Sequence, residues 1–425
     1  MSGEPRGLHR TFSSLQGRNY RLFFVGQVVS LIGTWMQRVA QDWLILELTG
    51  SALALSVGVA MQAIPVVLFG MWGGLLIDRF DKRLLLIWAQ VASGVLALVL
   101  GLLTLNGAAQ LWMVYALGFA LGLVTIVDLP GRQAFVHELV GDEGLANAVS
   151  LSSTMNNAAR LVGPALAGLL ITAVGLAPAF LINAVSFLAV IAAMLAMDVS
   201  ALRREMPVAR SRGQVRAGLE HVWATPRLRA PLVVVLVVSL FAQNFRITLP
   251  LMAEQVFGRG AAGYGTLLAM LGLGALGGAL ACATYARPTQ RLLLWLAAAL
   301  GLLSVLAALS PGWGVLVAMT VLVGAGHTGF NTTSNALVQM RSAPAMRGRV
   351  LALRNILTMG TTPVGGPMIG AVCELFGARM GLAAGGLVAV VAAAVAIPTK
   401  RLDRDEQDPS AAPGGQPGPR DPAAL

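Results

Sequence analysis

Long apolar runs, separated by short polar connections, dominate the sequence. Two of them, 53–77 and 84–105, are each long enough to cross a bilayer core of about 30 Å as a helix of about 20 residues. Between them lies Gly74-Leu-Leu-Ile-Asp78-Arg79-Phe-Asp81-Lys82-Arg83, which ends with five charges in six positions. A tight and mostly positive connection between two membrane helices is expected on the cytoplasmic face. These runs predict a polytopic membrane protein.

The composition excludes an ordinary soluble protein. The chain of 425 residues is 56% hydrophobic and 12% charged, whereas a soluble globular domain carries about 25% charged residues. The first 21 residues hold four arginines and no short hydrophobic run that ends in a small-residue cleavage site. We therefore expect no cleaved signal peptide and a cytoplasmic N-terminus over 1–20.

The position of the charges explains the net charge of +11 better than nucleic-acid binding does. Twelve spans can be placed on the apolar runs, and most of the 30 Lys and Arg residues then fall in inner segments. Only Arg259 and Arg379 fall in outer connections. This bias predicts that both ends of the chain are cytoplasmic and that the chain contacts a lipid bilayer and no nucleic acid.

The predicted spans form two groups of six. We expect a first six-helix bundle over 21–197, a cytoplasmic linker over 198–229, a second bundle over 230–399 and a disordered cytoplasmic tail over 400–425. Within the linker, apolar residues recur at helical spacing from Val215 to Trp223, which predicts an amphipathic helix on the membrane surface. A polar connection over 131–144 is expected between the fourth and fifth spans.

The two halves repeat each other. Arg38 and Arg246 are separated by the same 208 positions as Arg83 and Arg291, and Gly163-Pro164 has a counterpart in Gly366-Pro367. Internal repeats of this kind occur in secondary transporters, where the substrate site lies between the repeats. The second copy of the charged connection has Ala286 where the first has Asp78.

The charged connection resembles a motif of the major facilitator superfamily, Gly-x-x-x-Asp-Arg-x-Gly-Lys/Arg-Arg between helices two and three. Gly74, Asp78, Arg79, Lys82 and Arg83 match it, whereas Asp81 replaces the glycine. The resemblance implies an all-α membrane protein of twelve transmembrane helices in two pseudo-symmetric six-helix bundles. It also implies that Asp78 caps the start of the eleventh span and that these residues act as a conformational latch.

The segment Gly163-Pro164-Ala-Leu-Ala-Gly168 resembles the Gly-Pro-x-x-Gly-Gly signature of drug and metabolite antiporters in that superfamily. Proline removes a backbone hydrogen bond and bends a helix, and small residues allow close helix packing. We expect Gly163, Pro164 and Gly168, with Gly366 and Pro367, to form such a bend and seal; ordinary small-residue packing is the alternative. Segments 33–51, 147–151 and 347–350 resemble bacterial exporters that include enterobactin-type siderophore exporters and macrolide efflux pumps.

Ionisable residues within spans are costly and usually functional. Asp42 lies four residues after Arg38, so the two can pair on one helix face. They form either a self-neutralised pair or a proton-coupling site, in which Asp42 exchanges a proton for a positive partner. Asp128 lies near the inner end of span four, and the resemblance pairs it with Arg79, Lys82 or Arg83 in the latch.

Arg160 and Arg246 have no acidic residue within one turn on their own helices. The central cavity is therefore expected to carry surplus positive charge and to prefer anionic substrates. Gln37, Asn156 and Asn244 would add hydrogen-bonding groups to this substrate cavity, although any one amide can simply bond a neighbouring helix.

These features predict a monomeric secondary transporter of the bacterial inner membrane. It would export a small amphipathic organic molecule, such as a siderophore, drug or metabolite, in exchange for protons. No cofactor, metal or catalytic residue is expected, because the cysteines and histidines lack ligand spacing. The alternatives are an uptake symporter on the same fold, a polytopic membrane enzyme and a non-transporting membrane sensor or scaffold.

Overall fold

The computed structural model describes residues 13–203, 220, 222–284, 288–343 and 346–396. Throughout this part of the chain the only regular secondary structure is helical. The expected tail over 400–425 and the first part of the expected amphipathic helix lie outside these residues. Of that helix only its end is described, where Val222 is buried and Trp223 is exposed.

The first half of the chain forms five helices after a short 3-10 turn at Ser13–Gln16. They are α2 (Arg18–Thr49), α3 (Ala52–Arg79), α4 (Lys82–Leu105), α5 (Leu111–Val174) and α6 (Ala177–Leu195). Local signals set their ends: the Ser51 side chain caps α3, and the Asp81 carboxylate accepts the Leu84 N–H at the start of α4. Asp81 thus has a local role at the position where the superfamily motif has glycine.

Helix α5 contains both the fourth and the fifth spans. A straight helix of its 64 residues would be about 96 Å long, about three times the thickness of a bilayer core. It turns at Gly141, whose φ of 66° is not helical. The expected polar connection over 131–144 is therefore wrong, because this segment is helical up to the break and buries Phe135 and Val136 against Tyr20 and Leu86.

The second half repeats the pattern with two interrupted spans. Its elements are α8 (Pro226–Phe241), α9 (Phe245–Leu251), a π-helical turn (Met252–Val256), α10 (Gly260–Thr284), α11 (Gln290–Ala308), α12 (Trp313–Arg341), α13 (Arg347–Met359), α14 (Thr362–Phe376) and α15 (Ala378–Ala396). The seventh span is divided into α8 and α9, and the eleventh into α13 and α14. Eleven helical stretches in the described chain are long and apolar enough to span a membrane, and α5 supplies two of twelve spans.

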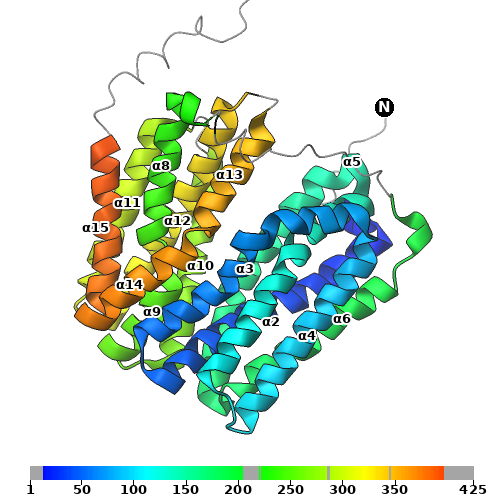
Figure 1. The fold of residues 1–425 in the computed structure, drawn as a ribbon, viewed down its shortest axis with the longest axis horizontal. Coiled ribbons are helices and arrows are strands. Elements are labelled where there is room, and N and C mark those ends of the chain that lie inside the picture. Colours follow the sequence, from blue (N-terminus) through cyan, green and yellow to red (C-terminus); the bar gives the residue numbers. More distant parts are fainter. Residues whose placement is uncertain (1–12, 204–219, 221, 285–287, 344–345, 397–425) are drawn as a thin grey trace, which may run out of the picture.

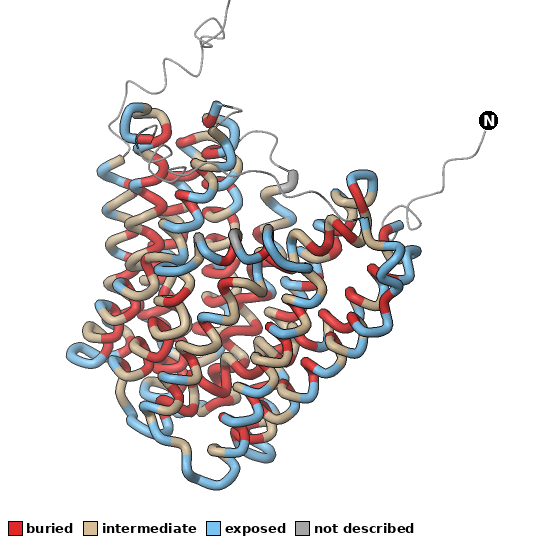
Figure 2. The backbone as a smooth tube through the Cα atoms, turned by 45° about the vertical axis from the view of Figure 1, so that its right-hand side comes forward, coloured by how far each residue is buried: buried red, intermediate tan, exposed pale blue. Residues whose placement is uncertain are grey.

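The helices of the two halves lie side by side and diverge toward one end of the molecule (Figure 1). We call this end, where α3 meets α4 and where α13 begins, the open end. At the opposite, closed end the halves are in contact, with α5 packed on α10 and α3 packed on α14. Exposed apolar side chains such as Leu169, Leu280 and Trp295 remain on the outside of the helices. Figure 2 shows how buried and exposed positions alternate along the described helices. Such a surface fits contact with lipid.

Candidate functional site

A cavity of about 990 Å³ lies between the two halves. Its volume is at the upper end of the range for pockets that bind drug-sized molecules. Helices α2, α3 and α5 line one side of it, and the interrupted seventh and eleventh spans line the other. The second half contributes Ser239, Gln243, Arg246, Thr358, Met359 and Thr362.

The two helix interruptions lie beside this cavity. Between α8 and α9, the Asn244 side chain donates to the carbonyl of Leu240 at 2.8 Å and so satisfies part of the interrupted backbone. Between α13 and α14, Gly360 and Thr361 precede Pro363, which has no N–H to continue the helix. Discontinuous helices at a central site are typical of secondary transporters. Gly360-Thr-Thr-Pro363 could have predicted the second interruption, whereas the first carries no glycine or proline.

Asp42 and Arg246 form an ion pair that joins the halves. Arg246 donates from Nη2 to Oδ1 at 2.7 Å and from Nε to Oδ2 at 3.0 Å, and the Tyr264 hydroxyl donates to Oδ2 at 2.7 Å. The Asp42 side chain is almost fully buried. The sequence suggested that Asp42 pairs with Arg38. In the structure Asp42 pairs with Arg246 instead, and the guanidinium of Arg38 lies over the Trp35 ring at 4.6 Å. Arg246 has its acidic partner on the other half of the molecule.

The charged residues of the expected latch have other partners in this structure. Asp128 forms a two-point ion pair with Arg132, at 2.6 and 2.9 Å, and accepts a hydrogen bond from Gln90. Lys82 pairs with Glu138 on α5, and Arg83 donates to the carbonyl of Met194 at 2.8 Å. In this structure Arg132 is therefore the partner of Asp128, and Glu138 is the partner of Lys82, instead of the expected pairing between Asp128 and the basic residues of the latch.

The rest of that motif lies in the last turns of α3. Gly74 is partly buried and Arg79 is exposed at the open end. Asp78 belongs to the helix, but its side chain is outside the described part of the structure. Because the halves are apart at this end, the latch remains a prediction for a state in which they meet.

Small residues allow the close approach of helices at the closed end. A Cβ added to Gly265 on α10 would lie 2.4 Å from the carbonyl oxygen of Pro164 and 2.9 Å from the Cα of Gly168. A Cβ on Gly163 would meet Trp35 within the first half, so this glycine packs α5 on α2. The expected signature therefore lies where α5 crosses α10.

The repeated glycine-proline segment is at the equivalent crossing of α14 and α3. A Cβ on Gly370 would lie 2.4 Å from Ser56 Oγ, and one on Gly366 would lie 3.7 Å from the Ser56 carbonyl oxygen. Pro367 is partly buried in α14. Two glycine-lined crossings thus bring the backbones of the two halves together.

A carboxylate also bridges the halves at the closed end. Glu374 Oε2, near the end of α14, accepts hydrogen bonds from the Ala52 N–H at 2.6 Å, the Leu53 N–H at 3.2 Å and the Ser51 hydroxyl at 3.1 Å. These groups form the first turn of α3. Unpaired N–H groups and the helix dipole favour an anion there. No sequence signal singled out Glu374.

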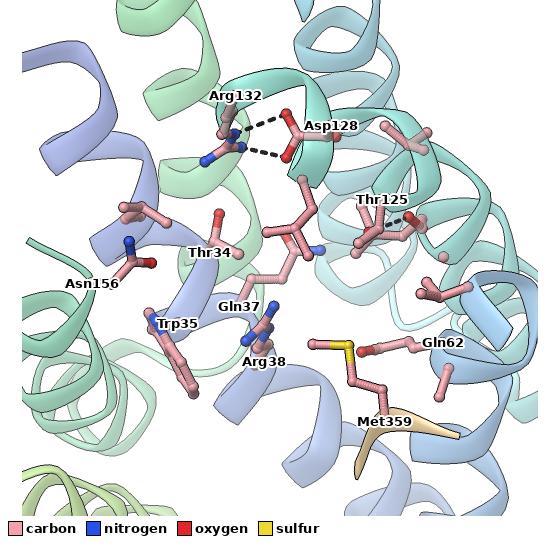
Figure 3. Close-up of a pocket in the computed structure, with 18 of the residues that line it drawn as sticks. Thr34, Trp35, Gln37, Arg38, Gln62, Thr125, Asp128, Arg132, Asn156 and Met359 are labelled. Carbon is pink, nitrogen blue, oxygen red and sulfur yellow. Dashed lines mark hydrogen bonds and ion pairs between the residues drawn. The ribbon is translucent and has the colours of Figure 1, made fainter. Parts of the chain in front are cut away.

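The expected cavity residues divide into two sets. Gln37, Asn156 and Arg246 line the cavity, whereas Arg160 and Asn244 are not part of its lining. Gln37 accepts a hydrogen bond from Asn183, and Asn156 donates to the carbonyl of Ser152. Figure 3 shows Gln37, Arg38 and Trp35 on one helix, with the Asp128–Arg132 pair above them and Met359 opposite.

Comparison with known proteins identifies the family over nearly the whole chain. Residues 9–418 match the family model described as transmembrane secretion effector. The chain is 22% identical to the staphyloferrin A transporter of Staphylococcus aureus, over 84% of this chain and 90% of that protein. It is 24% identical to macrolide efflux protein A of Streptococcus pyogenes, over 82% and 88% of the two chains. For multidrug efflux pump Tap of Mycolicibacterium fortuitum the identity is 27%, over 87% and 93%.

Solved structures agree on the fold. A bacterial homologue of the human lysosomal transporter Spinster, inward-facing and unoccupied, superposes with a TM-score of 0.72 at 13% identity, covering 92% of this chain and 98% of the other. A bacterial homologue of the iron transporter ferroportin, also inward-facing, gives 0.67 at 16% identity, covering 92% and 99%. The resemblance and the fold class read from the sequence are therefore confirmed: the chain belongs to the transmembrane secretion effector family and is a multi-pass membrane transporter of the major facilitator type.

Proposed function

We propose that this transporter exports an amphipathic organic molecule across the bacterial cell membrane by proton antiport. The observation that carries the proposal is the cavity of about 990 Å³ between the halves, lined by both polar and apolar side chains. It can hold a drug-sized molecule. Relatives named for macrolide efflux and multidrug efflux support export over uptake.

The difference between the two ends supports transport by alternating access. The closed end is held together by Glu374, by the Asp42–Arg246 pair and by the two glycine-lined crossings. The open end carries the basic residues of the α3–α4 connection, which favours a cytoplasmic location for it and for both termini. This state would take up substrate from the cytoplasm. Release needs the closed end to part while the latch residues Asp78, Arg79, Lys82, Arg83 and Asp128 meet the second half.

Asp42 is the residue we assign to proton coupling. In the present state its charge is matched by Arg246 from the other half. When the halves part at the closed end, this pair must separate, and a buried carboxylate that loses its cation takes up a proton more readily. Arg38, the other residue of the expected proton-coupling site, lies one turn away on α2. Protonation from outside would therefore accompany opening toward the outside.

Efflux assays in inverted membrane vesicles test this function. The protein is supplied with a panel of siderophores, macrolides and other drugs, with and without an imposed pH gradient. We expect at least one compound to accumulate inside the vesicles only when the vesicle interior is acidic, and collapse of the gradient with an ionophore to abolish accumulation. Accumulation that does not depend on the gradient would reject proton antiport. Accumulation only with the opposite gradient would indicate an uptake symporter.

A further inference from the structure

The charged residues that line the cavity are balanced except for one. Asp128 is paired with Arg132, and Arg246 is paired with Asp42. Arg38 is the remaining charged residue of the lining. Among the described residues no carboxylate forms an ion pair with it. The lining therefore has one surplus positive charge, and the structure places it at Arg38 instead of Arg160 or Arg246.

The other two cavity arginines already form two-point ion pairs. Arg132 donates to Asp128 through Nε and Nη2 and to Gln27 through Nη1. Arg246 uses Nε and Nη2 on Asp42. The guanidinium of Arg38 instead lies 4.6 Å from the centre of the Trp35 ring, one turn earlier on α2. A stacked guanidinium is held by its face and keeps its N–H groups at the edge for a further partner.

Several neutral groups in the same lining also lack a partner. The amide nitrogens of Gln27 and Gln243 and the hydroxyl of Ser239 are buried, and no acceptor or donor in the described structure bonds them. Gln27 comes from the first half, while Gln243 and Ser239 come from the interrupted seventh span. Buried polar groups are normally hydrogen-bonded. Unpartnered donor groups thus occur on both sides of the cavity.

We propose that the cavity binds an organic anion, whose carboxylate or similar planar two-oxygen group pairs with the edge of Arg38. The fork of a guanidinium matches such a group with two parallel hydrogen bonds, and the contact with Trp35 holds the Arg38 guanidinium in place. In Figure 3, Arg38 lies between Trp35 and Met359, away from the Asp128–Arg132 pair. The apolar part of the ligand lies against the aromatic and aliphatic lining. This inference rests on the proposed export function and names its substrate class.

Equilibrium binding to the purified protein in lipid nanodiscs tests the site with three probes of one shape. They are 2-naphthoate, neutral 2-naphthamide and cationic 2-naphthylmethylamine. We expect the carboxylate to bind most tightly and the cation least. Arg38→Gln should weaken naphthoate binding about 10- to 100-fold, as expected for loss of a charge-assisted bond, with little change for naphthamide. Arg38→Lys should lose less, because it keeps the charge without the fork.

A matched arginine outside the cavity controls for charge and folding. Arg259 lies 5.8 Å from the Trp313 ring and is not part of the lining, so Arg259→Gln should leave naphthoate affinity unchanged. Three outcomes would each overturn the site. They are equal affinity for naphthoate and naphthamide, no naphthoate binding, and unchanged naphthoate binding in Arg38→Gln. Binding needs no gradient, so this result is independent of the vesicle assay. Efflux without anion-selective binding would reject only the anion site. Anion-selective binding without efflux would reject only the proposed export function.

Discussion

The carboxylate of Glu374 accepts a hydrogen bond of 2.6 Å from the backbone N–H of Ala52 and so connects the end of α14 to the start of α3. The two residues belong to different halves of the molecule. Glu374 and Ala52 can therefore meet only while the two halves are in contact at this end, so the hydrogen bond stabilises that state alone.

Replacement of Glu374 should shift the balance between the two states. Loss of a helix cap costs about 1 kcal/mol, which is about a fivefold change in an equilibrium constant. Glu374→Ala should increase the population open at this end by that factor. Single-molecule energy transfer between dyes on Asn106→Cys and Gly312→Cys, with Cys282 and Cys373 replaced, measures it.

Glu47 provides the control for this variant. It is exposed in the last turn of α2, at the closed end, and among the described residues no hydrogen bond or ion pair links it to the second half. Glu47→Ala removes the same charge and should leave the distance distribution unchanged. An equal shift in both variants would attribute the effect to surface charge and not to the cap.

Asp42→Asn should abolish efflux driven by a pH gradient while the protein still inserts and binds substrate. The amide can keep a hydrogen bond to Tyr264, but it cannot take up and release a proton. We expect at least about a 100-fold loss of gradient-driven accumulation in inverted vesicles, the lower end of the range for a missing proton-transfer group. Tyr264→Phe removes one hydrogen bond and keeps the carboxylate, so it should remain coupled. Full gradient-driven transport by Asp42→Asn removes this residue from the coupling role.

The crossing of α5 and α10 should be sensitive to a single methyl group. Gly265→Ala places a Cβ 2.4 Å from the Pro164 carbonyl oxygen, so the backbones must move apart at a cost of about 1–3 kcal/mol. We expect a lower unfolding temperature and slower efflux. Gly277, on the same helix, has no atom within 4 Å of its added Cβ, so Gly277→Ala should match or exceed wild-type stability. Equal stability of the two variants would contradict this packing.

Asp78→Asn should slow transport without loss of protein from the membrane, because the resemblance assigns Asp78 to the latch that holds the open end when it closes. The initial rate of efflux in vesicles, divided by the amount of protein, measures the effect. Asp81→Asn is the comparison: Asp81 caps α4 at 3.0 Å from the Leu84 N–H, and asparagine caps a helix as well as aspartate does, so this variant should leave stability and rate close to wild type. An unchanged rate in Asp78→Asn would reject the latch assignment.

Much of the fold could be read from the sequence because a bilayer imposes strict lengths. The run over 84–105 became α4, Lys82–Leu105, almost residue for residue. The charged connection before it fixed where two helices meet. The polar residues of segment 131–144 suggest a loop, yet the segment is helical. Phe135, Val136 and Leu139 lie on one helical face and pack against other helices of the first half.

The candidate site was less predictable, because its contacts join distant parts of the chain. The sequence placed Asp42 beside Arg38 on one helix, yet its partner Arg246 lies 204 positions away in the other half. Arg132 and Glu138 were missed because they lay in the segment assigned to a loop. The interruption at Gln243 has no local breaker, so only the packing of the second half reveals it.

The turns at the closed end set how a molecule would leave. Glycines with φ between 57° and 86° make them tight: Gly50, Gly107, Gly175, Gly258, Gly260 and Gly377. Connections this short cannot fold over the exit as a lid. A molecule passing through this end would meet water as soon as α3 separates from α14 and α5 from α10, so its residence time on the protein would depend on helix tilt and not on loop motion.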